Sequence, residues 1–186
     1  YKGIGGEDDV TQTRSGTFWP FWRLMRSLMT ENRAPRIIVL ENVYGVLTSN
    51  KGKDFASIGT VLSDAGYRFG AMMIDAVHFV PQSRPRVFIV AVHPTVELSQ
   101  QLVSQTPVTP WHPERMVTAF NGLSAKAQEL WLWWNLPLPD KRLITFTDII
   151  DEEPVGVKWD SPEKTKLLLS MMTEANLSKV KAAMKS

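Results

Sequence analysis

One carboxyl group and two guanidinium groups stand beside apolar runs that have the character of buried strands. Glu41 follows the apolar residues 37–40 directly, and Arg84 and Arg86 lie two positions apart where residues 87–92 begin a second apolar run. Residues two apart in an extended chain point to the same side. Two positive charges at the entry of a buried strand require a carboxylate, a phosphate or a polarised carbonyl opposite them, because an unpaired buried charge is costly.

These three residues allow two interpretations. Glu41 can be a structural glutamate that caps an element or forms a salt bridge, and the two arginines then serve only to pair with its charge. It can also be a reactive carboxyl that the arginines hold in place, and the two interpretations are compatible. In an open α/β sheet, ligands bind at the carboxyl ends of the strands, which is where we expect Glu41.

The elements around these residues predict an α/β fold. Apolar residues at helical spacing predict a helix from Phe18, and a second helical pattern over 55–65 stops at Gly66. Strands are predicted at 36–40, 67–75 and 86–92. The continuous apolar runs are typical of strands buried on both faces, which favours a parallel sheet covered by helices. We therefore expect the second half of a doubly wound sheet.

The character of the chain changes after residue 93. A proline-rich connector follows, then a helix that starts at Ser124 and runs through Trp131–Trp134, and a helix that starts at Ser161-Pro162-Glu163. This division predicts a catalytic part over 1–93 and a connector with a helical segment over 94–186. The tryptophan cluster indicates packing or docking, with stacking on single-stranded nucleic acid as the alternative.

Composition excludes several classes of protein. The chain has 186 residues, of which 44% are hydrophobic and 22% charged, so it is not wholly disordered or fibrous. It has no apolar run long enough to cross a membrane, and its net charge of +2 neither requires nor forbids a nucleic-acid partner. The absence of cysteine rules out disulfides, zinc–thiolate sites and a thiol nucleophile supplied by this chain, and no metal site is predicted.

The two charged motifs together resemble the cytosine-C5 DNA methyltransferase family. The first is Arg36-Ile-Ile-Val-Leu-Glu41-Asn42-Val43-x-Gly45, and about 40 residues later comes Pro81-Gln82-x-Arg84-x-Arg86. The spacing, the intervening helix and the helix start near Phe18 all fit, so the resemblance of these motifs covers residues 1–93. Residues 94–186 resemble the connector and the start of a specificity region in some bacterial-type members of the family.

The resemblance implies the chemistry of methyl transfer to cytosine. Family members add a cysteine thiolate to C6, and C5 then attacks the methyl group of S-adenosylmethionine. Glu41 would share a proton with cytosine N3, which stabilises the charge that develops during addition. Arg86 would donate to O2, and Arg84 would orient the network. The substrate would be double-stranded DNA with the target cytosine flipped out of the stack.

Other residues take implied roles with less support. Asn42 would brace the loop that carries the nucleophile, Gln82 would contact the substrate, and Phe18 would contact the cofactor. The family's Pro-Cys motif and its glycine-rich cofactor motif are both absent from the chain. Residues 1–14 look like the part of the mobile loop that follows the cysteine. We therefore expect a fragment, or one subunit of a split enzyme, that is inactive alone.

Three alternatives stay open at this point. The chain can be the central piece of the enzyme, a non-catalytic DNA-binding or partner-docking module of the same lineage, or an unrelated α/β protein with a structural ion network. A sheet that lacks its other half would expose an edge, through which the chain could dimerise. The family resemblance implies a cytoplasmic protein of bacterial or phage type.

Overall fold

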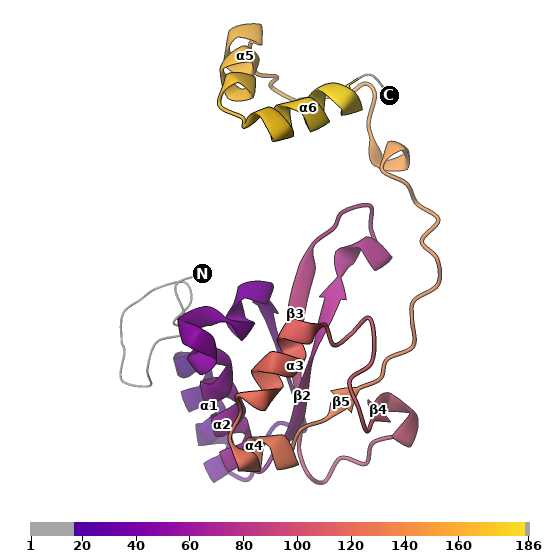
Figure 1. Ribbon diagram of the computed structural model, residues 1–186. Coiled ribbons are helices and arrows are strands. Elements are labelled where there is room, and N and C mark those ends of the chain that lie inside the picture. Colours follow the sequence, from indigo (N-terminus) through magenta and orange to yellow (C-terminus); the bar gives the residue numbers. More distant parts are fainter. Residues whose placement is uncertain (1–16, 185–186) are drawn as a thin grey trace. The chain divides into compact units, whose positions relative to one another are not determined.

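A computed structural model describes residues 17–184, arranged as a mixed α/β protein (Figure 1). The predictions for residues 1–14 therefore lie outside the described residues. The chain divides into two compact units, the first ending at Asp148 and the second covering Ile149–Ser186. Within residues 17–184 no helix is long and apolar enough to span a bilayer.

The first unit holds the elements predicted around the charged motifs, together with further short elements that the sequence did not indicate. In chain order they are α1 (Phe18–Thr30), β1 (Ile37–Val43), η1 (Tyr44–Leu47), η2 (Ser49–Gly52), α2 (Lys53–Asp64), β2 (Arg68–Asp75), η3 (Ala76–His78), β3 (Pro85–Val92), η4 (Gln100–Leu102), β4 (Val103–Ser104), α3 (Glu114–Asn121), α4 (Ala125–Glu129), β5 (Trp133–Trp134) and η5 (Thr147–Ile149), which crosses into the second unit. Helix α1 begins at Phe18 as predicted, and α2 is followed by Gly66 at a φ of +80°.

The main sheet has three strands in the order β1-β3-β2, and β3 runs antiparallel to both neighbours. The predicted parallel pairing is therefore wrong for these strands, although β1 and β2 are parallel to each other across β3. The strand β1 is also not buried on both faces, since Ile37 and Val39 are 56% and 57% exposed. The apolar run of β1 identified a strand correctly, but apolar content alone does not fix strand direction or the cover on each face.

Each face of the sheet belongs to a different hydrophobic core. One face, which includes Ile38, Ile89 and Ala71, packs with residues of α1, α2, α3 and α4. Figure 1 shows α1 and α2 beside each other on one side of the sheet. The other face, which includes Met72 and Phe88, packs against the connector through Trp111 and Trp134. Residues 94–136 therefore form part of the first unit's core, while the functional division at residue 93 stays a prediction.

The two edges of the sheet differ. The outer edge of β2 is covered by later parts of the chain. The Phe69 N–H donates to the Leu130 carbonyl, and the Phe69 carbonyl accepts the Leu132 N–H. Further along β2, the Met73 N–H donates to the Trp111 carbonyl. The outer edge of β1 pairs with no strand among residues 17–184. The sheet therefore has one sealed edge and one that is open for pairing.

The tryptophan cluster corrects the prediction of a long helix from Ser124. Helix α4 ends at Glu129, and Trp133 and Trp134 form strand β5, paired with β4. The backbone bonds of Leu130 and Leu132 to β2 replace helical ones. Trp131, Trp133 and Trp134 are each at most 8% exposed, so their ring faces are covered by protein and cannot stack on single-stranded nucleic acid. The packing interpretation is confirmed.

The second unit contains two helices, α5 (Pro162–Ser170) and α6 (Glu174–Ala183). Ser161 caps α5 by accepting a hydrogen bond from the Lys164 N–H, and Pro162 occupies the first helical position. The predicted helix start at Ser161-Pro162-Glu163 is confirmed, because both residues suit the first turn, where N–H groups lack helical acceptors.

The buried His112 makes the stability of the first unit depend on pH. Its ring is 5% exposed, its Nδ1 accepts the Val108 N–H, and its centroid lies 4.9 Å from that of Trp133. Burial is the largest influence on His112 and lowers its pKa. Below about pH 6.5 His112 binds a proton in the unfolded chain but stays neutral in the folded chain. The free energy of unfolding therefore falls as the pH falls.

We expect urea unfolding, followed by tryptophan fluorescence, to show a lower free energy of unfolding at pH 5.5 than at pH 7.5. The loss is about 1 kcal/mol, since one titrating group changes stability by at most about 1.4 kcal/mol per pH unit. The variant His112→Gln removes the titration and should flatten this dependence. An equal pH dependence in both proteins would show that another group causes it.

Candidate active site

Glu41 and Arg86 meet on one face of the sheet. Glu41 lies opposite Phe88 and Arg86 lies opposite Val43, so the two residues are diagonal neighbours on adjacent strands. Diagonal neighbours in an antiparallel pair are within reach of long side chains. The Arg86 Nε atom lies 2.9 Å from the Glu41 Oε1 atom. Strand pairing thus brings together two charged groups that are 45 residues apart in the sequence.

The contact is an ion pair without a well-directed hydrogen bond. The Nε–H group of Arg86 is buried and does not point at an acceptor, although the nitrogen and the carboxylate oxygen are close. The Nη1 group donates to the Pro85 carbonyl at 2.9 Å. Glu41 is 54% exposed and Arg86 is 19% exposed. A pair as open as this contributes about 1 kcal/mol or less to stability, so stability alone does not explain it.

Glu41 lies within β1, two residues before its end, instead of at the strand's exit as predicted. The strand extends through Asn42 and Val43 because β3 supplies partners as far as Arg86. The side chain of Asn42 accepts a hydrogen bond from the Val43 N–H at 2.9 Å. This bond fixes the end of the strand locally, and the predicted bracing of a nucleophile loop by Asn42 stays a prediction.

The other predicted residues are not brought to the Glu41–Arg86 pair by a hydrogen bond or ion pair in the described part of the chain. Arg84 and Gln82 are exposed, and only their backbone groups form hydrogen bonds. Phe18 is 9% exposed, and its ring stacks on that of Trp22 with centroids 6.3 Å apart. Phe18 therefore belongs to the core, and a contact with a cofactor stays a prediction.

Sequence reasoning missed Asp75, which fixes the loop that carries Gln82 and Arg84. Its Oδ1 atom accepts the Arg84 N–H at 2.6 Å and the Val77 N–H at 3.1 Å, while Oδ2 accepts the Ser83 hydroxyl at 2.9 Å. Partial burial raises the pKa of Asp75, but these bonds and the charge of His78 outweigh it and leave the pKa lowered. The signal was available, since aspartate at a strand end commonly binds the backbone two residues on.

Replacing Asp75 with alanine should release this loop. We expect amide hydrogen exchange at Arg84 and Val77 to accelerate by at least about tenfold, since a hydrogen bond to a charged group contributes about 1.5–3 kcal/mol. The variant Asp75→Asn keeps a carbonyl acceptor and serves as the matched control. Unchanged exchange in Asp75→Ala would show that Asp75 does not hold the loop.

Comparison with known proteins identifies the family. The chain matches the family model for C-5 cytosine-specific DNA methylases over residues 3–152. It is 27% identical over 161 residues to the orphan methyltransferase M.SPBetaI of Bacillus phage SPbeta, covering 82% of this chain and 34% of that protein. It is 35% identical over 88 residues to the type II methyltransferase M2.BsuMI of Bacillus subtilis (strain 168), covering 47% of this chain and 22% of that protein.

These matches place the chain in a family of DNA methylases. The chain belongs to the C-5 cytosine-specific DNA methylase family, whose members use S-adenosylmethionine. It spans about a third of the length of M.SPBetaI and of the putative type II methyltransferase M.BsuMIIP of Bacillus subtilis (strain 168).

Proposed function

We propose that the protein containing this chain transfers a methyl group from S-adenosylmethionine to C5 of a flipped cytosine in duplex DNA. The observation that supports it is the 2.9 Å approach of Arg86 Nε to Glu41 Oε1, made by two motifs inside the segment that matches the family. This chain supplies the groups that bind the cytosine edge. The nucleophile lies elsewhere, because the chain has no cysteine, so the chain alone transfers no methyl group.

The geometry suggests how the charged groups divide the work. Glu41 is exposed enough to reach the N3 edge of an entering base, and hydrogen bonding there is stronger as charge develops. In Arg86, Nε lies 2.9 Å from Glu41 Oε1 and Nη1 donates to the Pro85 carbonyl, which leaves Nη2 to donate to cytosine O2. Arg84, whose backbone N–H donates to Asp75, orients this network. Gln82 contacts the substrate, and Asn42 braces the loop that carries the nucleophile.

S-adenosylmethionine, when bound, supplies the methyl group. The described residues offer one candidate contact for it, Phe18, whose ring is already packed against Trp19 and Trp22. A complete cofactor site therefore needs residues beyond those that the structure describes. We place the reaction in the cytoplasm of a bacterium or phage host, as the sources of the relatives suggest.

The test is methyl transfer from tritiated S-adenosylmethionine to duplex DNA. A longer polypeptide in which a Pro-Cys motif precedes this chain should produce 5-methylcytosine, identified after digestion to nucleosides. The 186-residue chain alone should stay at background. Methylation of another base by the longer polypeptide, or none at all, would contradict the proposal.

A second candidate function is supported by the open edge of β1. Ile37 and Val39 are exposed there, and an unpaired edge favours strand addition. The chain would then act as an assembly module, either pairing with the other part of a split methyltransferase or forming a dimer. Light scattering measures the mass of the chain in solution. A dimer supports pairing of two copies through β1, and a monomer contradicts that self-pairing.

A further inference from the structure

A basic cavity lies in the segment that follows β1. It measures about 380 Å³ and is formed by the loop from Leu47 to Lys53, the first turn of α2 and one side of α3. Cavities of this size hold small ligands or single groups of larger ones. The Glu41–Arg86 pair does not contribute to its lining. The cavity is therefore a separate place where a ligand group can bind.

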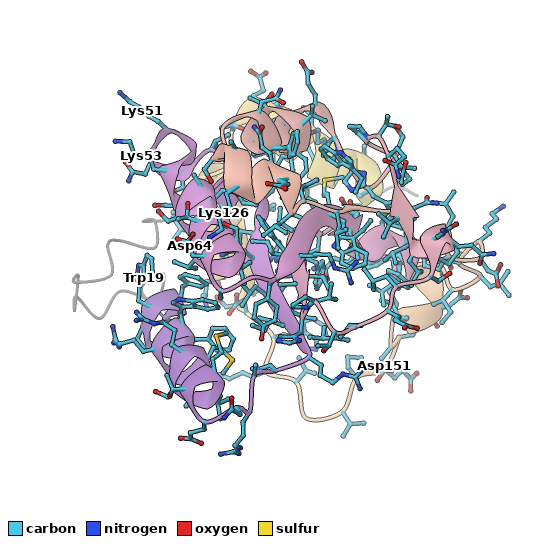
Figure 2. All side chains as sticks on the ribbon, turned by 90° about the horizontal axis from the view of Figure 1, so that it is seen from below. Trp19, Lys51, Lys53, Asp64, Lys126 and Asp151 are labelled. Atoms are coloured by element: carbon cyan, nitrogen blue, oxygen red, sulfur yellow. The ribbon has the colours of Figure 1, made fainter. Side chains whose placement is uncertain are left out.

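The charge of the cavity selects an anion. Lys51, Lys53 and Arg115 line it, and no acidic side chain among the described residues does. Neither lysine forms an ion pair in the described part of the chain, whereas Lys126 and Lys164 each pair with an aspartate. Figure 2 shows Lys51 and Lys53 extending from the same end of α2. The guanidinium carbon of Arg115 lies 5.7 Å from the centre of the Tyr44 ring, which holds that charge in place.

The backbone of the loop has an unusual conformation beside the cavity. Asn50, Lys51 and Gly52 have φ values of 49°, 57° and 83° in succession, a conformation that costs energy at the two residues other than glycine. The Ser49 hydroxyl donates to the carboxylate of Asp54, which is buried and does not line the cavity. Gly52, the N-cap residue of α2, makes no side-chain cap, and the Asp54 carboxylate in the first turn offsets part of the positive potential of the first N–H groups.

We propose that Lys51, Lys53 and Arg115 bind a backbone phosphate of the DNA duplex whose cytosine enters the Glu41 site. This inference rests on the proposed function. The strand β1 ends two residues after Glu41, and the loop that lines the cavity begins at Leu47, six residues after Glu41, so the loop follows the same end of the strand. The proposed reaction offers two anions, the phosphates of the DNA and the carboxylate of S-adenosylmethionine, and only a phosphate contact makes duplex binding depend on these lysines. Such a contact positions the duplex without reading its sequence.

The test is the salt dependence of duplex binding by the 186-residue chain, measured by fluorescence anisotropy. Each phosphate that the protein neutralises adds about 0.9 to the steepness with which log K falls against log salt. We expect the Lys51→Met, Lys53→Met double variant to make this slope shallower by about 0.9, the contribution of one phosphate, and each single variant to make it shallower by less. Lys126→Met removes the same charge from an ammonium that lies 2.8 Å from Asp64, and should leave the slope unchanged.

Inorganic phosphate at constant ionic strength provides a second measurement. It should weaken duplex binding by the wild type and have less effect on the Lys51→Met, Lys53→Met double variant. An unchanged salt slope in that variant overturns the inference even if phosphate alone binds, because the cavity would then hold another anion. A wild-type chain that binds no duplex at about 50 mM salt, where such binding is strong, contradicts the proposed function together with this inference.

Discussion

Replacing Glu41 with glutamine should reduce methyl transfer by about 10²–10⁴-fold in a polypeptide that joins this chain to its nucleophile. Glutamine keeps the size of the side chain but cannot share a proton with cytosine N3, so the transition state loses more stabilisation than the ground state. Duplex affinity should change by less than about fivefold, because an exposed ion pair such as Glu41–Arg86 contributes about 1 kcal/mol or less. Tritium transfer and anisotropy measure the two quantities on the same preparation.

The control for this variant is Glu31→Gln. Glu31 is also an exposed glutamate, with Oε2 2.9 Å from the Arg33 Nη1 atom, and it lies after α1 and not in the sheet. It should retain full turnover. Full turnover in Glu41→Gln as well would remove Glu41 from the mechanism, and an equal loss of binding and turnover would assign it to duplex binding only.

Replacing Gly70 with alanine should destabilise the first unit by about 3 kcal/mol, at the upper end of the usual cost of overpacking. A Cβ atom at this position would lie 1.8 Å from the Leu132 carbonyl oxygen and 3.1 Å from Trp134 Cδ1. The obstructing oxygen belongs to the backbone that seals the edge of β2, so it cannot move without breaking that edge. Urea unfolding monitored by tryptophan fluorescence measures the loss of stability.

Gly122→Ala is the matched control for the Gly70 variant. Its Cβ would lie 3.4 Å from the Ala119 carbonyl oxygen, which is ordinary contact, and the residue has a φ of −84°. We expect a change within about 0.5 kcal/mol. Equal stability of Gly70→Ala and the wild type would mean that residues 130–134 do not seal the sheet as closely as the structure places them.

The elements near the charged motifs could be predicted because local patterns specify them. Periodic apolar residues gave α1 its start at Phe18, and the strand predicted at 67–75 appears as Arg68–Asp75. The Glu41–Arg86 contact was anticipated from the motifs, and the strand register provides it. The helix and the strand depend on residues that are close in sequence. The Glu41–Arg86 contact could be anticipated because the family resemblance places the two motifs at one site.

Long-range pairing could not be predicted from the same patterns. The helical character expected through Trp133 and Trp134 gave way to β-pairing because Val103 and Ser104 offered backbone partners. The direction of β3 depends on a reversal over residues 76–84, which Asp75 fixes by hydrogen bonds. The cavity of Lys51 and Arg115 joins segments more than 60 residues apart, and no spacing in the sequence indicates it.

The placement of β3 between β1 and β2 has a consequence for biosynthesis. Every interstrand bond of the three-stranded sheet involves β3, the last of the three strands to be made. A ribosome adding about 5–20 residues per second needs roughly 3–10 s to pass from the end of β1 to the end of β3. During that interval the edges of β1 and β2 that later pair with β3 have no strand partner among residues 17–184. A nascent chain released before Pro85 would carry two aggregation-prone segments and no sheet, which makes it a natural client for chaperones.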